Sequence, residues 1–115
     1  MEMEAEVIGA IKFVKLTAES KIHSTNNKEF VRALTEHTQQ MEPNTTLVFD
    51  MAEVTYIDSA ALGSILAGLA HMRKKGGDLK LCNMQNRVRA IFELTRVHHV
   101  CDIFNTKQEA IDAHQ

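Results

Sequence analysis

At 115 residues, the chain has the length of one domain that can bury its own hydrophobic core without disulfides or metal. Hydrophobic residues make up 44% of it and charged residues 24%, values typical of a soluble globular protein. The net charge of −2 provides no broad basic surface for nucleic acid, no apolar run is long enough to span a bilayer, and the acidic start differs from a signal peptide. We therefore expect one cytoplasmic domain over residues 1–115 that neither binds nucleic acid nor inserts into a membrane.

The N-terminal part of the chain predicts a β-hairpin, a polar loop and a helix. Residues 2–7 form a short edge strand, Gly9 supplies the turn, and residues 11–16 form a second strand with alternating apolar side chains. Residues 17–27 are polar and typical of a loop. The helix that follows ends before Pro43. Its buried face is formed by Phe30, Leu34, Thr38 and Met41.

A strand and a helix joined by a short loop are predicted in the centre of the chain. The apolar residues 47–49 stop at Asp50, which is typical of a buried strand. Asp58 and Ser59 lie at the N-terminus of the helix that follows the loop. Beyond them, apolar side chains recur at the spacing of a helix face, at Leu62, Ile65, Leu66, Leu69 and Met72.

The remaining part of the chain continues the alternation of strands and helices. Gly76 and Gly77 end the central helix, and Thr106 with Glu109 forms a capping box that opens a terminal helix burying Ile111. Between them we expect a strand at 78–82, a helix at 85–94 and a short strand at 100–104. This order indicates a single-domain α/β fold: a mixed β-sheet of four to five strands, with about four α-helices packed mainly on one face.

Enzymatic and metal-binding functions find little support in the sequence. Ser59 follows a strand and precedes a helix, as a hydrolase nucleophile does, but the Gly-x-Ser-x-Gly motif of such serines is absent. His98, His99 and Cys101 could supply metal ligands, although adjacent histidines in a strand point to opposite faces. We therefore predict a protein that is not an enzyme and has no cofactor or metal site. A metal at residues 98–102 and a hydrolase using Ser59 remain the alternatives.

The pair Asp58 and Ser59 has a structural and a functional interpretation. Asp and Ser are the preferred residues at helix N-caps, where they bind otherwise unpaired backbone amides. A helix N-terminus also stabilises a phosphate, so phosphorylation of Ser59 would add charge at the surface without unfolding the domain. A partner docked over the same spot would be disfavoured, because burying an unpaired charge is costly. Ser59 is thus well placed to switch binding.

The central helix also carries a face of small residues opposite its apolar stripe. The face is formed by Ala60, Ser64, Ala67 and Gly68, with His71 at its end. One interpretation is tight packing against a neighbouring helix of the same domain. The other is a docking surface that another protein can approach closely. The sequence leaves both open.

Two segments of the chain carry a resemblance to a known family. The run VFDMAEVTYIDSAALGSIL at residues 48–66, followed by GGDLKLCNMQNRVRAIFELTRV at residues 76–97, resembles a STAS domain, and most closely the free-standing bacterial anti-sigma-factor antagonists. The family pattern is a strand ending in Asp, then Val/Ile-x-x-Ile-Asp-Ser-Ser-Gly-Leu-Gly, and later a Gly-Gly turn, a strand and a helix ending near Leu-Thr. The resemblance follows the order of elements along essentially the full chain.

This resemblance implies a function and a set of site residues. Ser59 matches the serine that is phosphorylated by an anti-sigma factor that is itself a serine kinase, and Asp58 matches the acidic residue that shapes the site. Unphosphorylated, such a protein binds the kinase and frees the sigma factor, and a phosphatase resets it. ATP would belong to the kinase. With the small-residue face described above added to these two residues, the predicted partner-binding residues are Asp58, Ser59, Ala60, Ala61, Ser64, Ala67, Gly68, His71 and, in the first loop, His23.

Two departures from the family pattern motivate an alternative function. Ala61 replaces a glycine, and residues 18–23 read Ala-Glu-Ser-Lys-Ile-His where many relatives have Gly-Glu-Leu/Ile-Asp. The alternative is a STAS interaction subunit of a lipid-transport ATPase complex or a signalling scaffold that uses the same helix face without phosphorylation. The oligomeric state stays open, although an edge strand near the N-terminus permits weak self-association.

Overall fold

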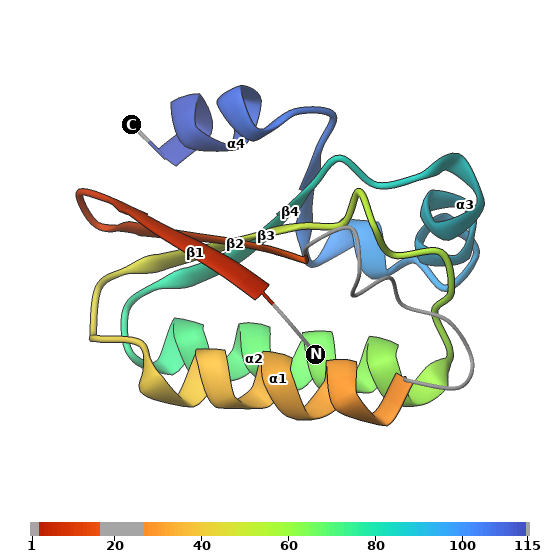
Figure 1. Cartoon of the computed structure of the whole chain (residues 1–115), viewed down its shortest axis with the longest axis horizontal. Coiled ribbons are helices and arrows are strands. Elements are labelled where there is room, and N and C mark those ends of the chain that lie inside the picture. Colours follow the sequence, from red (N-terminus) through yellow and green to blue (C-terminus); the bar gives the residue numbers. More distant parts are fainter. Residues whose placement is uncertain (1–2, 17–26, 115) are drawn as a thin grey trace.

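The computed structural model describes residues 3–16 and 27–114, which form one five-stranded sheet with helices on both faces (Figure 1). Residues 17–26 of the predicted loop, including His23, lie outside the described residues, and residue 27 is the first residue of α1. In chain order the elements are β1 (Met3–Ile8), β2 (Ile11–Leu16), α1 (Asn27–Gln40), β3 (Thr46–Asp50), α2 (Ser59–Lys74), β4 (Asp78–Cys82), α3 (Asn86–Leu94), the 3-10 helix η2 (Val97–His99), β5 (Asp102–Phe104) and α4 (Lys107–His114).

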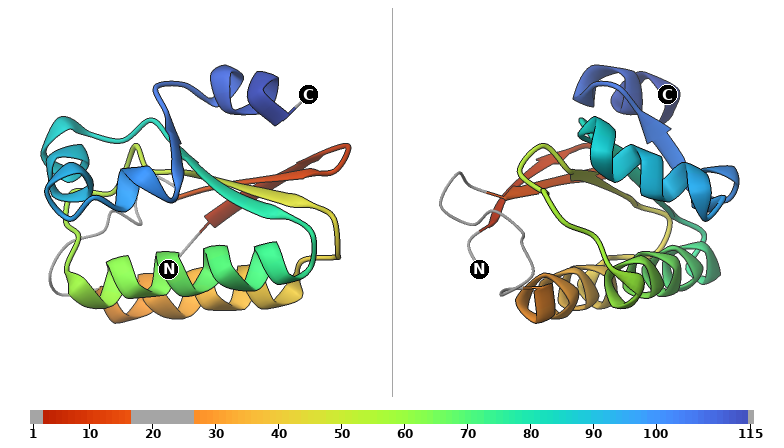
Figure 2. Two further views of the ribbon diagram at one scale, coloured as in Figure 1. Left: turned by 180° about the vertical axis from the view of Figure 1, so that it is seen from behind. Right: turned by 90° about the vertical axis from the view of Figure 1, so that its right-hand side faces the viewer.

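The sheet is mixed, as predicted, and its strands lie side by side in chain order. β1 and β2 form an antiparallel hairpin, whereas β2, β3, β4 and β5 are parallel neighbours. Gly9 begins the hairpin turn with φ +59, a conformation that L side chains rarely adopt. Each parallel pair is joined through a helix, and the right-handed sense of such connections places α1 and α2 together on one face. Figure 2 shows these two helices side by side beneath the sheet.

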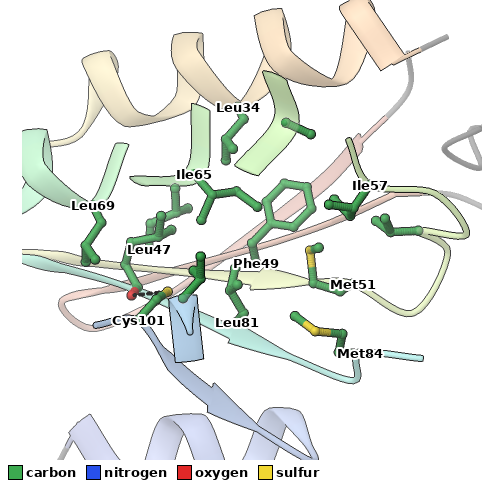
Figure 3. Packing of buried hydrophobic residues seen from close by; sticks show 14 of the residues in the cluster. Leu34, Leu47, Phe49, Met51, Ile57, Ile65, Leu69, Leu81, Met84 and Cys101 are labelled. Carbon is green, nitrogen blue, oxygen red and sulfur yellow. Dashed lines mark hydrogen bonds between the residues drawn. The ribbon is translucent and has the colours of Figure 1, made fainter. Parts of the chain in front are cut away.

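The main hydrophobic core lies between the sheet and the pair α1 and α2 (Figure 3). The ring of Phe30 on α1 meets the ring of Phe49 on β3 edge-on, with centroids 5.6 Å apart. From α3, Val88 and Phe92 join the same buried cluster. The strands and helices of this face are therefore held by one continuous apolar contact surface, which excludes water from the parallel strands.

A smaller apolar cluster lies on the opposite face of the sheet, beneath α4. Because successive strand residues point to opposite faces, Val48 points away from the face to which Phe49 belongs. Val48 packs there with Ala110 and Ile111 of α4. The prediction that helices pack mainly on one face is confirmed, with α4 as the helix on the other face.

The predicted helix boundaries are confirmed by their hydrogen bonds. Gly76 has φ +80 directly after α2, and the N–H groups of Gly76 and Gly77 donate to Arg73 O at 3.0 Å and Met72 O at 2.9 Å. At the start of α4, the N–H of Glu109 donates to Thr106 Oγ1 at 3.1 Å. The carboxylate of Glu109 accepts from the N–H of residue 105 at 3.3 Å, one residue before the N-cap, so only the Thr106 half of the predicted capping box is formed as the pattern prescribes.

The prediction was wrong for one core residue, Leu66, which is 37% exposed. The buried face of α2 is instead rotated toward α1, because α2 packs against both the sheet and α1. It consists of Ala61, Ile65, Gly68, Leu69 and Met72. The short helix η2 was not predicted either, and the last strand begins at Asp102 rather than at residue 100.

A polar contact joins α1 to β2 beside the main core. The ammonium of Lys12 donates to His37 Nδ1 at 3.2 Å, which requires an unprotonated nitrogen on the imidazole. Burial lowers the pKa of His37 below its ordinary value, the neighbouring Lys12 lowers it further, and Glu36 opposes the shift. The folded protein therefore favours the neutral form of His37.

We predict that this contact makes stability fall with acidification. The unfolded chain binds a proton at His37 near pH 6.5, whereas the folded chain does so only at lower pH. The free energy of unfolding should thus decrease as pH falls below 6.5 and level off below the pKa of the folded state. Urea titrations between about pH 8 and about pH 5 measure the effect as the difference between wild type and His37→Gln. Equal pH slopes for the two proteins would contradict the assignment.

Candidate functional site

The loop between β3 and α2, residues 51–58, is held by both side chains and backbone. Met51, Val54 and Ile57 are buried, at 0%, 0% and 5% exposure. The N–H of Met51 donates to Cys82 O at 2.8 Å, which extends the pairing between β3 and β4. The side-chain amide of Gln85 donates to Ala52 O at 2.8 Å from the start of α3. These contacts fix the position in space at which α2 begins.

Asp58 is the N-cap of α2. Its backbone is extended, with φ −117 and ψ −177, and its Oδ1 accepts a hydrogen bond from the N–H of Ala61 at 2.9 Å. Its carbonyl accepts the first backbone bond of the helix, from Leu62 at 3.0 Å. Ser59 is consequently the first helical residue, and its side chain is exposed. The capping role belongs to Asp58, so capping does not require the hydroxyl of Ser59.

The structure changes the interpretation of Ala61. Its side chain is fully buried in the main core, in the cluster that also contains Ile65 and Ile57. The methyl group that replaces the family glycine therefore points into the protein and not toward a partner. We remove Ala61 from the predicted partner-binding residues.

Gly68 is also buried. For this residue of the small-residue face, packing within the domain is therefore the correct interpretation. A Cβ atom at Gly68 would lie 2.9 Å from Cγ2 of Thr38 on α1, closer than Cβ atoms approach in proteins. The small residue thus permits close packing of α1 against α2, as the first interpretation holds. Gly68 is removed from the partner-binding residues, and the surface-exposed residues of that face are Ala60 and Ala67.

A shallow groove of about 230 Å³ lies between α1 and α2 next to Gly68. It is lined by Thr35, Thr38, Gln39, Ser64, Ala67, Gly68 and His71. Two atoms on the α2 side, Ser64 Oγ and His71 Nε2, are buried and lack a hydrogen-bond partner within the described residues. Such atoms normally bind water or a polar group of another molecule. Ser64 and His71 therefore stay in the predicted surface, now as the wall of a polar groove.

Sequence reasoning missed two contributions to this surface. Tyr56 lies in the loop before Ser59 and is 37% exposed, next to the buried Ile57. The exposure of Tyr56 could have been predicted from its position before the apolar Ile57, because side chains of an extended segment alternate in direction. The polar side chains of Thr35 and Gln39 on α1 are four residues apart and share one face of that helix.

His98 and His99 lie in the helix η2 and their rings are 4.3 Å apart, so the expectation that they lie in a strand and point to opposite faces was wrong. Burial raises the pKa of the Cys101 thiol to about 12, reinforced by Asp78 and Asp102, and the thiol lies 3.7 Å from Leu79 O. The Nδ1 atom of His98 lies 3.2 Å from Phe92 O. Within residues 3–16 and 27–114, no group of three or more His, Cys, Asp or Glu side chains could hold a metal ion. None of the helices described there is long and apolar enough to cross a membrane.

Comparison with known proteins identifies the family. The sequence matches the STAS domain family over residues 2–110, and the chain therefore belongs to that family. The anti-sigma-B factor antagonist of Listeria monocytogenes is 29% identical over 70 residues, which are 61% of this chain and 61% of that protein. The anti-sigma-B factor antagonist of Bacillus subtilis is 34% identical over 53 residues, 46% of this chain and 49% of that protein. The alignments thus span less than two thirds of these relatives.

Solved structures share the fold over nearly the whole chain. An anti-sigma-factor antagonist (STAS) domain protein from Planctomyces limnophilus has a TM-score of 0.82 at 17% identity, covering 96% of each chain. The anti-sigma factor antagonist SpoIIAA in its unphosphorylated form has a TM-score of 0.70 at 16% identity, covering 97% and 95%. The Bacillus protein SpoIIAA in its phosphorylated form has a TM-score of 0.66 at 15% identity, covering 99% and 100%. At these identities the likeness establishes the fold alone.

We predict that the effect of Gly68→Ala on stability depends on Thr38, because the two residues are closely packed. Gly68→Ala should destabilise the protein, because the new Cβ meets Thr38 Cγ2, which outweighs a helix-propensity gain of about 1 kcal/mol. In a Thr38→Ser background, which removes Cγ2 and keeps the hydroxyl, the same change should be less destabilising by roughly 1 kcal/mol. Urea unfolding of the four proteins measures this coupling.

Gly63→Ala is the matched control for that cycle. A Cβ at Gly63 has no atom within 4 Å, so the substitution should stabilise α2 by roughly 0.5–1 kcal/mol in both backgrounds. If Gly68→Ala behaved like Gly63→Ala, the two helices would not meet at this residue.

Proposed function

We propose that this protein is an anti-sigma-factor antagonist that binds a serine-kinase anti-sigma factor and is switched by phosphorylation at Ser59. The observation that carries the proposal is the division of roles at the start of α2. Asp58 caps the helix, while the adjacent Ser59 hydroxyl is exposed and not needed for the cap. The names of the curated relatives in Listeria and Bacillus support the same function.

The electrostatics of the helix start support a phosphate at Ser59. The first N–H groups of a helix point out of its N-terminus and carry partial positive charge. The first turn of α2 contains no acidic residue, so a phosphate there would meet Asp58 as its acidic neighbour in sequence. The phosphorylated and unphosphorylated SpoIIAA structures both retain the STAS fold, which supports a switch that leaves the fold intact.

The proposed partner surface consists of exposed residues around Ser59 and the groove beside α2. Tyr56 and Ala60 lie close to the serine in the chain. Farther along α2 come Ser64, Ala67 and His71, which line the groove. A negative charge placed at Ser59 in the middle of a docked surface would lose its hydrating water when the partner binds. Binding of the kinase is expected to weaken for that reason. A phosphatase acting on the exposed phosphoserine would restore binding.

A constitutive STAS subunit of a larger assembly is the alternative function for the same surface. One of its two motivations, the methyl group of Ala61, is removed because that residue is buried. The other motivation, the first loop, lies outside the described residues. The two functions differ in one measurable respect, since only the switch requires the hydroxyl of Ser59.

The test measures binding to each histidine-kinase-like serine kinase encoded in the same genome. Ser59→Asp should fold as wild type but bind its kinase roughly 10- to 100-fold more weakly. Ser59→Ala should bind as wild type yet accept no phosphate when kinase and ATP are added. Ala113→Asp is the charge control, because residue 113 is exposed on α4 at the opposite face of the sheet (Figure 1).

Three outcomes distinguish the functions. Loss of binding in Ser59→Asp but not in Ala113→Asp supports the switch. Equal binding of wild type and Ser59→Asp would contradict the electrostatic account. Absence of any kinase partner, together with capture of a membrane-transport ATPase complex by both wild type and Ser59→Ala, would favour the constitutive subunit.

A further inference from the structure

The outer edge of β1 has no partner strand among the described residues. β1 pairs with β2 on its inner side, in a register that runs from Met3 opposite residue 16 to Ile8 opposite Ile11. The two-residue turn makes Ile8 and Ile11 a hydrogen-bonded pair, and the pairs alternate from there along the hairpin. The backbone N–H and C=O groups of Met3, Ala5 and Val7 therefore point outward, away from β2.

This edge carries few of the devices that usually prevent strands from pairing between molecules, because its two charged side chains, Glu4 and Glu6, are each paired with a lysine of the same chain. β1 contains no proline and no lysine, and its six residues pair with β2 one for one, without a bulge. Val7 is 73% exposed, an unusual value for a β-branched apolar side chain in a strand. Within the described part of the chain, three backbone positions without a partner strand and one exposed valine thus lie along the same edge.

We infer that β1 pairs with β1 of a second copy of this chain, in antiparallel orientation and centred on Ala5. In this register Ala5 faces Ala5 of the other copy, and Met3 faces Val7. The outward backbone groups of one copy then lie opposite the outward backbone groups of the other. This gives three hydrogen-bonded residue pairs across the two-fold axis. A register shifted by one step, centred on Glu6, would retain only two such pairs. The strand is therefore most complementary to itself about Ala5.

Side chains on both faces agree with this register. On the face of the main core, the exposed Val7 would be covered by Met3, which already packs against that core. On the other face, Glu4 would lie opposite Glu6 of the second copy, a pairing that like charges would normally disfavour. Each of these glutamates, however, is paired with a lysine of its own chain. Glu4 lies 3.6 Å from Lys15 and Glu6 lies 3.0 Å from Lys107 of α4. The joined face is neutral in total.

The contact is small, so the dimer is weak and forms with rising concentration. A pair of six-residue strands buries less surface than a standard stable protein interface. The fraction of chains in the dimer should therefore change over the protein concentrations that sedimentation velocity can measure. The residues involved do not include Ser59 or the groove beside α2, and this inference stands apart from the proposed function.

Site-directed cross-linking tests the two-fold position. A cysteine introduced by Ala5→Cys faces its own copy and should form a disulfide dimer under mild oxidant, at least about tenfold faster than one introduced by Val7→Cys, which faces Met3. The native Cys82 and Cys101 should not interfere, because they are buried and burial raises the pKa of each thiol to about 12. Equal cross-linking rates for the two variants would overturn the register.

Sedimentation velocity of the unmodified chain tests the dimer itself. Wild type should shift from monomer toward dimer as concentration rises, and Val7→Lys should remain monomeric because a cation on the edge opposes pairing. Ala113→Lys, a cation on α4, is the matched control and should associate as wild type does. A wild type that stays monomeric, or a dimer that survives Val7→Lys, would overturn the proposal.

Discussion

The position of Ser59 depends on how the loop between β3 and α2 is held. Three apolar side chains of that loop are buried in the main core, and the carboxylate of Asp58 accepts from the amide of Ala61. Because the core fixes one side of the loop and the helix cap fixes its end, the first residue of α2 has little freedom of its own. A hydroxyl at that residue is exposed on a well-held base, and under the proposed function a change of its charge would act on the partner more than on the fold.

The fold was predictable because its signals are local. The change from a continuous apolar run to helical spacing marks β3 and α2, and Gly76 and Thr106 mark helix ends through their own hydrogen bonds. The helix start at the candidate site could be predicted for the same reason, since an aspartate followed by a serine is typical of a helix N-terminus. Which of the two caps the helix required the backbone geometry of Asp58.

What the sequence could not predict depends on neighbours far away in the chain. The direction of Leu66 and the burial of Gly68 follow from where α1 lies against α2, and Thr38 supplies that contact from thirty residues earlier. Ala61 lies on the same buried face of α2, within the main core. The polar groove with Ser64 and His71 exists only once both helices are in place. Within the small-residue face, Gly68 thus serves the packing of the fold, whereas Ala60 and Ala67 are exposed.

The most direct measurement compares the chain carrying phosphoserine at Ser59 with the unmodified chain by amide hydrogen exchange, alone and with its kinase. The account predicts equal protection of β3 and α2 in the two isolated forms, because Asp58 maintains the cap. With the kinase, it predicts added protection around Tyr56 and the α1–α2 groove in the unmodified form only. Loss of protection in the first turns of α2 on phosphorylation, or equal kinase binding by both forms, would contradict it.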